Sequence, residues 1–97
     1  MVENPVKTLL IVVEGRVQGV GYREFVRRIA QRRNLSGWVR NRSNGSVETR
    51  VSGLAPDLDA LMEAMRSGPP AAQVRGLQAI EEAAPPERDG FFIASTF

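Results

Sequence analysis

A glycine-rich segment, residues 15–23, separates two apolar stretches of different periodicity in this 97-residue chain. Before it, residues 7–14 are rich in Val, Ile and Leu, which is typical of a strand buried on both faces and central in its sheet. After it, apolar residues from Tyr22 to Ala30 follow the i, i+3, i+4, i+7 spacing of an amphipathic helix, which we expect to end near Asn34. The segment is therefore predicted to connect a strand directly to a helix.

Three glycines in this connection favour an anion-binding loop. Glycine allows tight turns, so successive N–H groups can converge ahead of a helix N-terminus, where the helix dipole favours negative charge. The loop lacks the lysine and hydroxyl of a Walker loop, and Glu24 stands where a dinucleotide-binding loop has its third glycine. Arg23 opens the helix, where a cation is unfavourable for the dipole, which indicates that it faces an anion. We therefore expect a phosphate as the ligand.

Composition excludes several classes of chemistry. The chain has no cysteine and no histidine, so disulfides, thiol chemistry, the usual zinc sites and imidazole catalysis are absent. The length fits one domain over residues 1–97, and the net charge of +2 suits anionic partners without selecting one. The longest early apolar stretch, residues 9–13, is too short for a signal peptide or a membrane span. A cytoplasmic protein that binds no membrane is expected.

The remaining elements predict the fold class. Residues 38–42 and 46–53 form a hairpin around Asn44-Gly45, and a second helix starts at Pro56 and stops at Gly68. Further strands are predicted over residues 74–82 and 91–97, after a loop over residues 83–90. This βαββαβ order plus a short edge strand predicts an α+β, ferredoxin-like two-layer sandwich, with a mainly antiparallel sheet and two helices on one face.

RNA-recognition modules share this order, but they stack bases on aromatic residues of their central strands. Residues 7–14 and 46–53 contain no aromatic residue, so no nucleic-acid partner is predicted. We interpret Trp38 as a packing anchor and the arginines of residues 27–33 as a solvated helix face. A nucleic-acid-binding or anion-sensing surface on those arginines remains an alternative, which salt-sensitive binding to polyanions would reveal.

Residues 15–23, Gly-Arg-Val-Gln-Gly-Val-Gly-Tyr-Arg, resemble the signature of acylphosphatases, and residues 37–41, Gly-Trp-Val-Arg-Asn, resemble their second motif. The resemblance extends through residues 44–48 and 68–74 and covers essentially the whole chain. It implies an enzyme that hydrolyses a small-molecule acyl phosphate to carboxylate and orthophosphate without a metal. We expect a monomer that needs no cofactor. The resemblance also implies that Arg23 binds the phosphate and Asn41 positions water. The backbone amides implied to cradle the phosphate are those of Arg16, Val17, Gln18, Gly19, Val20, Gly21 and Tyr22.

The residue types suit this chemistry on their own. Arg23 offers a planar, permanently charged fork for two phosphate oxygens, and the Asn41 amide can both donate to and accept from a water molecule. Asparagine is disfavoured in strands, and proximity to the glycine-rich loop would explain why Asn41 occurs in one. Taken singly, each residue also has a purely structural interpretation. The residues leave two alternatives for the acceptor of the water proton, a phosphate oxygen or another group. They do not identify the physiological acyl group.

Three positions depart from the acylphosphatase pattern. Tyr22 replaces the usual phenylalanine and is expected to bury its ring, Asn44 replaces a frequent aspartate, and Glu14 replaces a frequent histidine. The alternative function is a non-hydrolytic module that binds carbamoyl phosphate or another anion within a longer protein.

Overall fold

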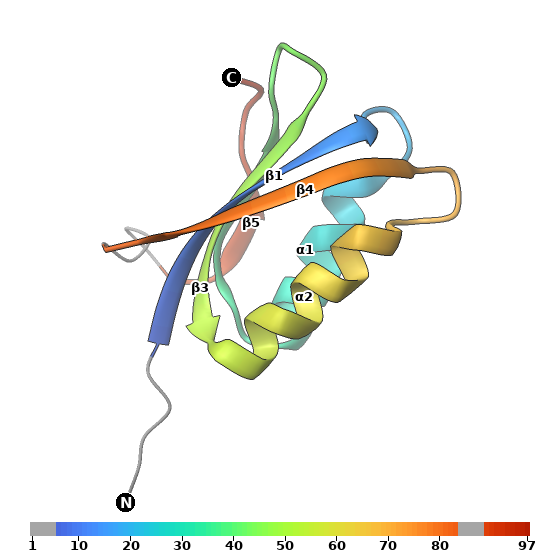
Figure 1. The fold of residues 1–97 in the computed structure, drawn as a ribbon. Helices are drawn as coiled ribbons and strands as arrows, with labels where there is room; N and C mark the ends of the chain where they lie inside the picture. Colours follow the sequence, from blue (N-terminus) through green and yellow to red (C-terminus); the bar gives the residue numbers. More distant parts are fainter. Residues whose placement is uncertain (1–5, 84–88) are drawn as a thin grey trace, which may run out of the picture.

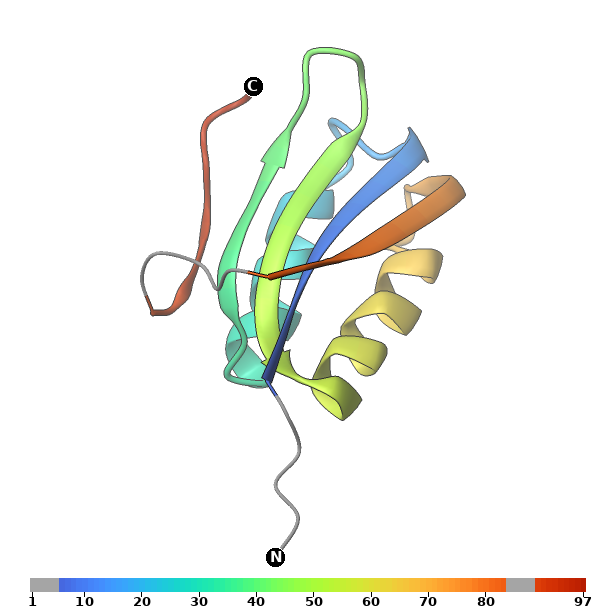
Figure 2. The same cartoon turned by 60° about the vertical axis from the view of Figure 1, so that its left-hand side comes forward.

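The computed structural model describes residues 6–83 and 89–97, and within them a five-stranded sheet carries both helices on one face (Figures 1 and 2). The strand order is β4-β1-β3-β2-β5, and all neighbours are antiparallel except the parallel pair β2 and β5. The predicted α+β two-layer arrangement is confirmed. The elements are β1 (Val6–Arg16), α1 (Tyr22–Arg32), β2 (Ser36–Asn41), β3 (Val47–Leu54), α2 (Ala55–Ser67), β4 (Gln73–Glu82) and β5 (Phe91–Ile93).

Strand β1 is central, between β3 and β4, as predicted. The prediction that it is buried on both faces is wrong. Ile11 and Val13 are fully buried in the core beneath the helices. Leu10 and Val12, whose side chains alternate with these, are only half-buried. Because both helices pack on the same face, one set of alternate side chains is left partly exposed. The apolar run therefore correctly indicated a central strand but overstated its burial.

Each helix buries one apolar stripe, and a residue with positive φ follows its C-terminal end. Helix α1 buries Val26 and Ala30, and after its last residue, Arg32, the chain turns at Asn34 with φ 56°. The N–H of Leu35 then bonds the carbonyl oxygen of Ala30 at 2.9 Å, a Schellman-type end that brings buried Leu35 under the helix. Helix α2 has a proline in its first turn and stops before Gly68, as predicted. None of the described helices is long and apolar enough to cross a membrane.

The β2–β3 hairpin turns at Asn44-Gly45 as predicted, and Gly45 has φ 95°. The last strand is shorter than the predicted 91–97, since β5 ends at Ile93. The following residues still run beside β2: Ala94 N–H bonds the Val39 carbonyl oxygen, and Phe97 N–H bonds that of Asn41. The chain advances three residues from Ala94 to Phe97 but only two from Val39 to Asn41, so the regular ladder between these segments is broken.

The open face of the sheet carries one cluster of charged and aromatic side chains. The Arg40 guanidinium lies 4.5 Å from the Trp38 ring centre and 4.3 Å from that of Phe97, and it pairs with Glu48 at 2.8 Å. Trp38 is thus a packing anchor, as expected. The predicted loop over residues 83–90 lies mostly outside the described residues.

Candidate active site

The glycine-rich segment forms the connection between β1 and α1. Gly19 and Gly21 have φ 74° and 79°, and Gly21 is the N-cap of α1 without any side-chain cap. The first N–H groups of a helix have no partner inside the helix, so an uncapped N-terminus offers them to a ligand. A Cβ added at either glycine would meet no atom within 4 Å, so both glycines border open space.

Gly15 sets the point at which the chain leaves the sheet. The pairing of β1 with β4 shifts register between Glu14 and Gly15, and Gly15 has φ 128°. A Cβ at Gly15 would lie 2.1 Å from the carbonyl oxygen of Gln73, which no side chain can tolerate. Only glycine therefore allows β4 to approach this closely at the base of the loop.

The middle of the loop is anchored by two side chains. Val17 is 1% exposed and belongs to the core. The Gln18 side-chain amide donates to the carbonyl oxygens of Arg42 at 2.8 Å and Ser46 at 2.9 Å. The loop is thereby fixed to the β2–β3 hairpin. The sequence indicated only a backbone role for Gln18, because nothing local marks a contact with residues more than twenty positions away.

Arg23 and Asn41 meet at one hollow. Arg23 lies in the first turn of α1 and Asn41 is the last residue of β2. The hollow has a volume of about 250 Å³. Of the residues predicted for the site, Arg16, Gln18 and Val20 do not line it. Its lining residues are Val17, Gly19, Gly21, Tyr22, Arg23, Glu24, Asn41 and Ile93.

Both polar side chains predicted to act here are available to a ligand. Within residues 6–83 and 89–97, the half-buried Arg23 guanidinium makes no hydrogen bond or ion pair. The Oδ1 atom of Asn41 is buried and has no hydrogen-bond partner in the same part of the chain. Leaving a buried acceptor unpaired costs ~1–3 kcal/mol, so such an atom is a candidate for binding a water or ligand.

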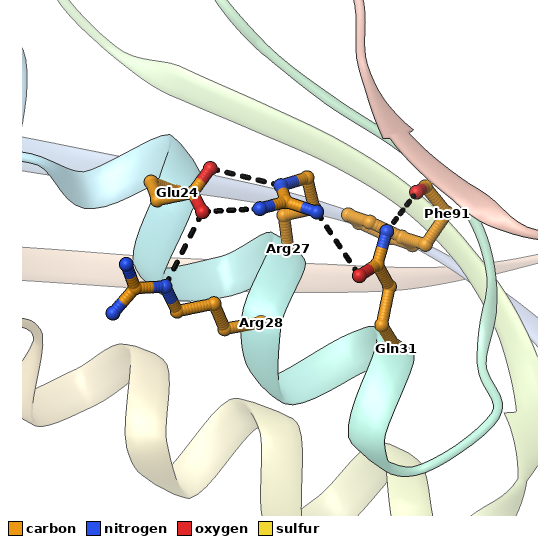
Figure 3. Close-up of polar contacts among 5 residues, drawn as sticks. All are labelled: Glu24, Arg27, Arg28, Gln31 and Phe91. Carbon is orange, nitrogen blue, oxygen red and sulfur yellow. Dashed lines mark hydrogen bonds and ion pairs between the residues drawn. The ribbon is translucent and has the colours of Figure 1, made fainter.

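Glu24 also lines the hollow, but its carboxylate is held by neighbouring arginines (Figure 3). Arg27 Nε donates to Oε2 at 2.8 Å, Arg27 Nη2 contacts Oε1, and Arg28 Nε lies 3.2 Å from Oε1. Hydrogen bonding by Arg27, with smaller contributions from Arg28, lowers the pKa of Glu24 to about 2. Sequence reasoning treated Glu24 only as a mismatch to a dinucleotide loop and missed its place at the site.

The arginines of residues 27–33, which we expected to form a solvated helix face, are mostly exposed, but three of them also pair with carboxylates. Besides pairing with Glu24, Arg27 donates to Gln31 Oε1 at 3.0 Å, and Gln31 Nε2 donates to the Phe91 carbonyl oxygen at 3.0 Å (Figure 3). Arg33 pairs with Asp57 of α2 at 3.2 Å. These contacts tie α1 to β5 and α2.

Tyr22 buries its ring, as expected from its place at the head of the apolar stripe. It is 1% exposed, and its hydroxyl donates to the Met65 carbonyl oxygen at 2.7 Å. Burial raises the pKa of this hydroxyl above its ordinary value. The Tyr22 hydroxyl is therefore hydrogen-bonded to the backbone of α2. Among the described residues, no group of three His, Cys, Asp or Glu side chains is placed to hold a metal ion.

Comparisons with known proteins agree with this geometry. The family model described as Acylphosphatase matches residues 9–93. An acylphosphatase from Azorhizobium caulinodans is 47% identical over 89 residues, which cover 92% of this chain and 96% of that protein. The crystal structure of acylphosphatase from Bacillus subtilis superposes with a TM-score of 0.87 at 38% identity, covering 91% of this chain and 98% of the other. Full-length HypF in its phosphate- and nucleotide-bound form gives a TM-score of 0.85 at 34% identity, covering 95% of this chain but 12% of HypF. With the glycine loop, the fold and these relatives in agreement, the chain belongs to the acylphosphatase family.

Proposed function

We propose that Arg23 holds the phosphoryl group of an acyl phosphate while Asn41 positions the attacking water, in a hydrolysis that needs no metal. Family membership makes the chain an acyl-phosphate hydrolase. One observation carries the assignment of roles: the free Arg23 guanidinium and the unpaired, buried Asn41 Oδ1 line the same hollow, within the described part of the chain.

The loop supplies the remaining phosphate contacts. We assign the cradle to the backbone amides of residues 16–22, helped by the uncapped N-terminus of α1. The Arg23 fork adds a full positive charge and two parallel donors, which suits the equatorial oxygens of a phosphoryl group. Together these groups hold the substrate and stabilise charge during transfer.

The chemical step demands little from the protein because a carboxylate is a good leaving group. Asn41 Oδ1 accepts a hydrogen bond from water and directs its lone pair at phosphorus. The new P–O bond forms as the bond to the acyl oxygen breaks, and that electron pair leaves with the carboxylate. The water proton passes to a phosphoryl oxygen, so RCO₂PO₃²⁻ and H₂O give RCO₂⁻ and H₂PO₄⁻. Glu24, with a pKa of about 2, is too weak a base to compete for this proton.

We further propose that residues 1–97 act as a single domain, as a cytoplasmic monomer without cofactor. The single sheet and the continuous core of the described residues support one domain. The pairing of Arg27, Arg28 and Arg33 with carboxylates lowers the charge available for polyanions, which supports the absence of a nucleic-acid partner. Sedimentation of the purified protein tests the monomer, and filter binding to RNA and DNA tests the partner.

A second candidate function is phosphate or carbamoyl-phosphate binding without hydrolysis. The likeness to HypF favours it, because that protein carries a region of this fold within a much longer chain. The fold is common to both candidates, so only turnover separates them.

The test is hydrolysis of acetyl phosphate and benzoyl phosphate by the purified protein in the presence of a chelator. We expect rapid turnover that inorganic phosphate inhibits competitively and that Arg23→Ala abolishes. Arg75→Ala is the matched control, since Arg75 is an exposed arginine of β4 that does not line the hollow. Turnover that the chelator stops would contradict the metal-independent mechanism. A folded protein that binds phosphate but shows no turnover would favour the second candidate.

A further inference from the structure

The first residue of α1 is hydrogen-bonded to the last turn of α2. The two helices run in opposite directions over the sheet, so the start of α1 lies beside the end of α2 (Figure 1). The Tyr22 hydroxyl joins them by donating to the Met65 carbonyl oxygen at 2.7 Å, and this contact is buried. Tyr22 also lines the hollow that Arg23 and Asn41 share. One side chain therefore connects the wall of the proposed phosphate site to α2.

The Met65 carbonyl oxygen lacks the donor that a regular helix would give it. That donor is the N–H four residues further on, and the residue there is Pro69, which has no N–H. The N–H of Gly68 bonds instead to the Ala64 carbonyl oxygen at 2.8 Å. The Tyr22 hydroxyl takes the place of the missing donor. A phenylalanine would fill the same space but would supply no hydrogen bond.

The segment between α2 and β4 contacts both ends of the glycine-rich loop. A Cβ added at Gly68 would lie 3.1 Å from Cε2 of Tyr22, so the ring packs closely against the backbone at the end of α2. Further along the segment, Gln73 pairs with Arg16, and its carbonyl oxygen packs on Gly15 at the other end of the loop. A shift of the end of α2 would therefore change the shape of the loop.

The two glycines that precede α1 are not held by side-chain packing. A Cβ added at Gly19 or Gly21 would meet no atom within 4 Å, and Gly21 caps α1 without any side-chain hydrogen bond. Their positions depend on the anchored residues on either side. Gln18 is bonded to the β2–β3 hairpin, and Tyr22 is bonded to α2. The Tyr22 hydroxyl is thus the anchor on the helix side of the loop.

We propose that Tyr22 is a positioning residue for phosphate binding: its hydroxyl holds the first turn of α1 against α2 and so keeps the loop amides aligned for the phosphoryl group. This inference rests on the proposed function. The hydroxyl is bonded to Met65 and acts only through the backbone. Donors that are already aligned bind a ligand without a further loss of conformational entropy. Loss of one neutral hydrogen bond that maintains this alignment corresponds to about a threefold to tenfold weaker affinity.

The test compares Tyr22→Phe, which keeps the ring and removes only the hydroxyl, with Thr49→Val as the matched control. Thr49 is fully buried, and its hydroxyl donates to the Trp38 carbonyl oxygen at 2.6 Å within the sheet. Both variants should unfold at a lower temperature than the wild type, because each loses a buried hydrogen bond. Calorimetry with inorganic phosphate should give a dissociation constant about threefold to tenfold higher for Tyr22→Phe and unchanged for Thr49→Val.

A second measurement uses the wild-type protein and needs no substitution. If phosphate binding and the contact with α2 support each other, saturating phosphate should slow hydrogen exchange at the end of α2. The reporter is the Gly68 N–H, which bonds to the Ala64 carbonyl oxygen and does not line the hollow. The matched control is the Arg33 N–H, which bonds to the Ile29 carbonyl oxygen at the far end of α1. We expect phosphate to slow exchange more at Gly68 than at Arg33.

Equal phosphate affinities in the wild type and Tyr22→Phe would overturn the positioning role and leave the proposed function intact. An equal loss of affinity in Thr49→Val would also overturn it, because a general loss of stability would then explain the effect. Hydrogen exchange that phosphate slows equally at Gly68 and Arg33, or at neither, would contradict the coupling. A wild-type protein that does not bind phosphate would overturn the proposed phosphate site and this inference together.

Discussion

The Nε2 atom of Gln18 lies 2.8 Å from the carbonyl oxygen of Arg42, the residue that follows Asn41. The same nitrogen donates to the carbonyl oxygen of Ser46 at 2.9 Å. These two hydrogen bonds join the loop between β1 and α1 to the hairpin between β2 and β3. The distance between the phosphate loop and Asn41 therefore depends on a side chain that does not line the hollow.

We predict that Gln18→Ala weakens phosphate binding and slightly destabilises the fold. Each carbonyl oxygen keeps a backbone donor, from Gly45 N–H or Arg42 N–H, so the free energy of unfolding should fall by only ~1 kcal/mol. Inorganic phosphate should inhibit less well because the loop is no longer held. The matched control is Asn44→Ala, which removes hydrogen bonds to Ser46 within the same hairpin but none to the loop. Equal phosphate inhibition in the two variants would contradict the proposed anchoring.

Asn41→Ala should separate turnover from binding. Removing one positioned polar group of a reacting site costs on the order of 10²- to 10³-fold in kcat. Inhibition by inorganic phosphate should stay nearly unchanged, because Arg23 and the loop remain. The variant should also be as stable as the wild type or more stable, by up to ~1 kcal/mol, since it removes an unpaired buried oxygen. Steady-state kinetics and urea unfolding check both parts, and full turnover would rule out the role of Asn41.

Arg23→Lys should keep the charge but lose the planar fork. Charged hydrogen bonds contribute ~1.5–3 kcal/mol each, so loss of one should weaken inhibition by phosphate about tenfold or more. Arg75→Lys, the same exchange on an exposed position of β4, should leave inhibition unchanged. If lysine at position 23 bound phosphate as well as arginine, simple charge attraction rather than bidentate geometry would explain the site.

Gly15→Ala is expected to be severely destabilising, by ~3 kcal/mol or more, because the new Cβ would collide with the Gln73 carbonyl oxygen and Gly15 has φ 128°. Gly76→Ala on the facing strand is the matched control. Nothing lies within 4 Å of a Cβ there, and its φ is not in the left-handed range, so its free energy of unfolding should change by at most ~0.5 kcal/mol. Similar unfolding midpoints for the two variants would show that β4 can move away from the loop.

Glu24→Gln should lower stability at neutral pH without stopping catalysis. Its pKa falls from the ordinary value of 4.5 to about 2 in the folded protein. The ion pairs therefore stabilise the fold fully above pH 4.5, and their contribution is lost as the pH falls through about 2. The difference in stability between wild type and variant should thus vanish in acid, and it should shrink with added salt. Urea unfolding across this range measures it. A large loss of kcat at pH 7 would instead make Glu24 the proton acceptor.

The local signals of the chain were sufficient for most of the fold. Features that depend only on near neighbours can be predicted from the local sequence. They include the helix period after Tyr22, the Asn44-Gly45 turn, and the boundaries at Pro56 and Gly68. Strand β4 alternated less clearly because it lies at the edge of the sheet and all its positions are exposed or half-exposed, which leaves no buried face to set a period of two.

The sequence by itself determined the chemical character of the site, because the glycines of residues 15–21 allow backbone conformations that other residues rarely adopt and Arg23 is out of place at a helix start without an anion. Tertiary structure decided which side chains meet. The Gln18 anchor, the pairing of Glu24 with Arg27 and the convergence of Arg23 with Asn41 all join segments far apart or depend on rotamers. Such contacts follow from how the sheet and helices pack, and packing is a property of the whole chain rather than of any window within it.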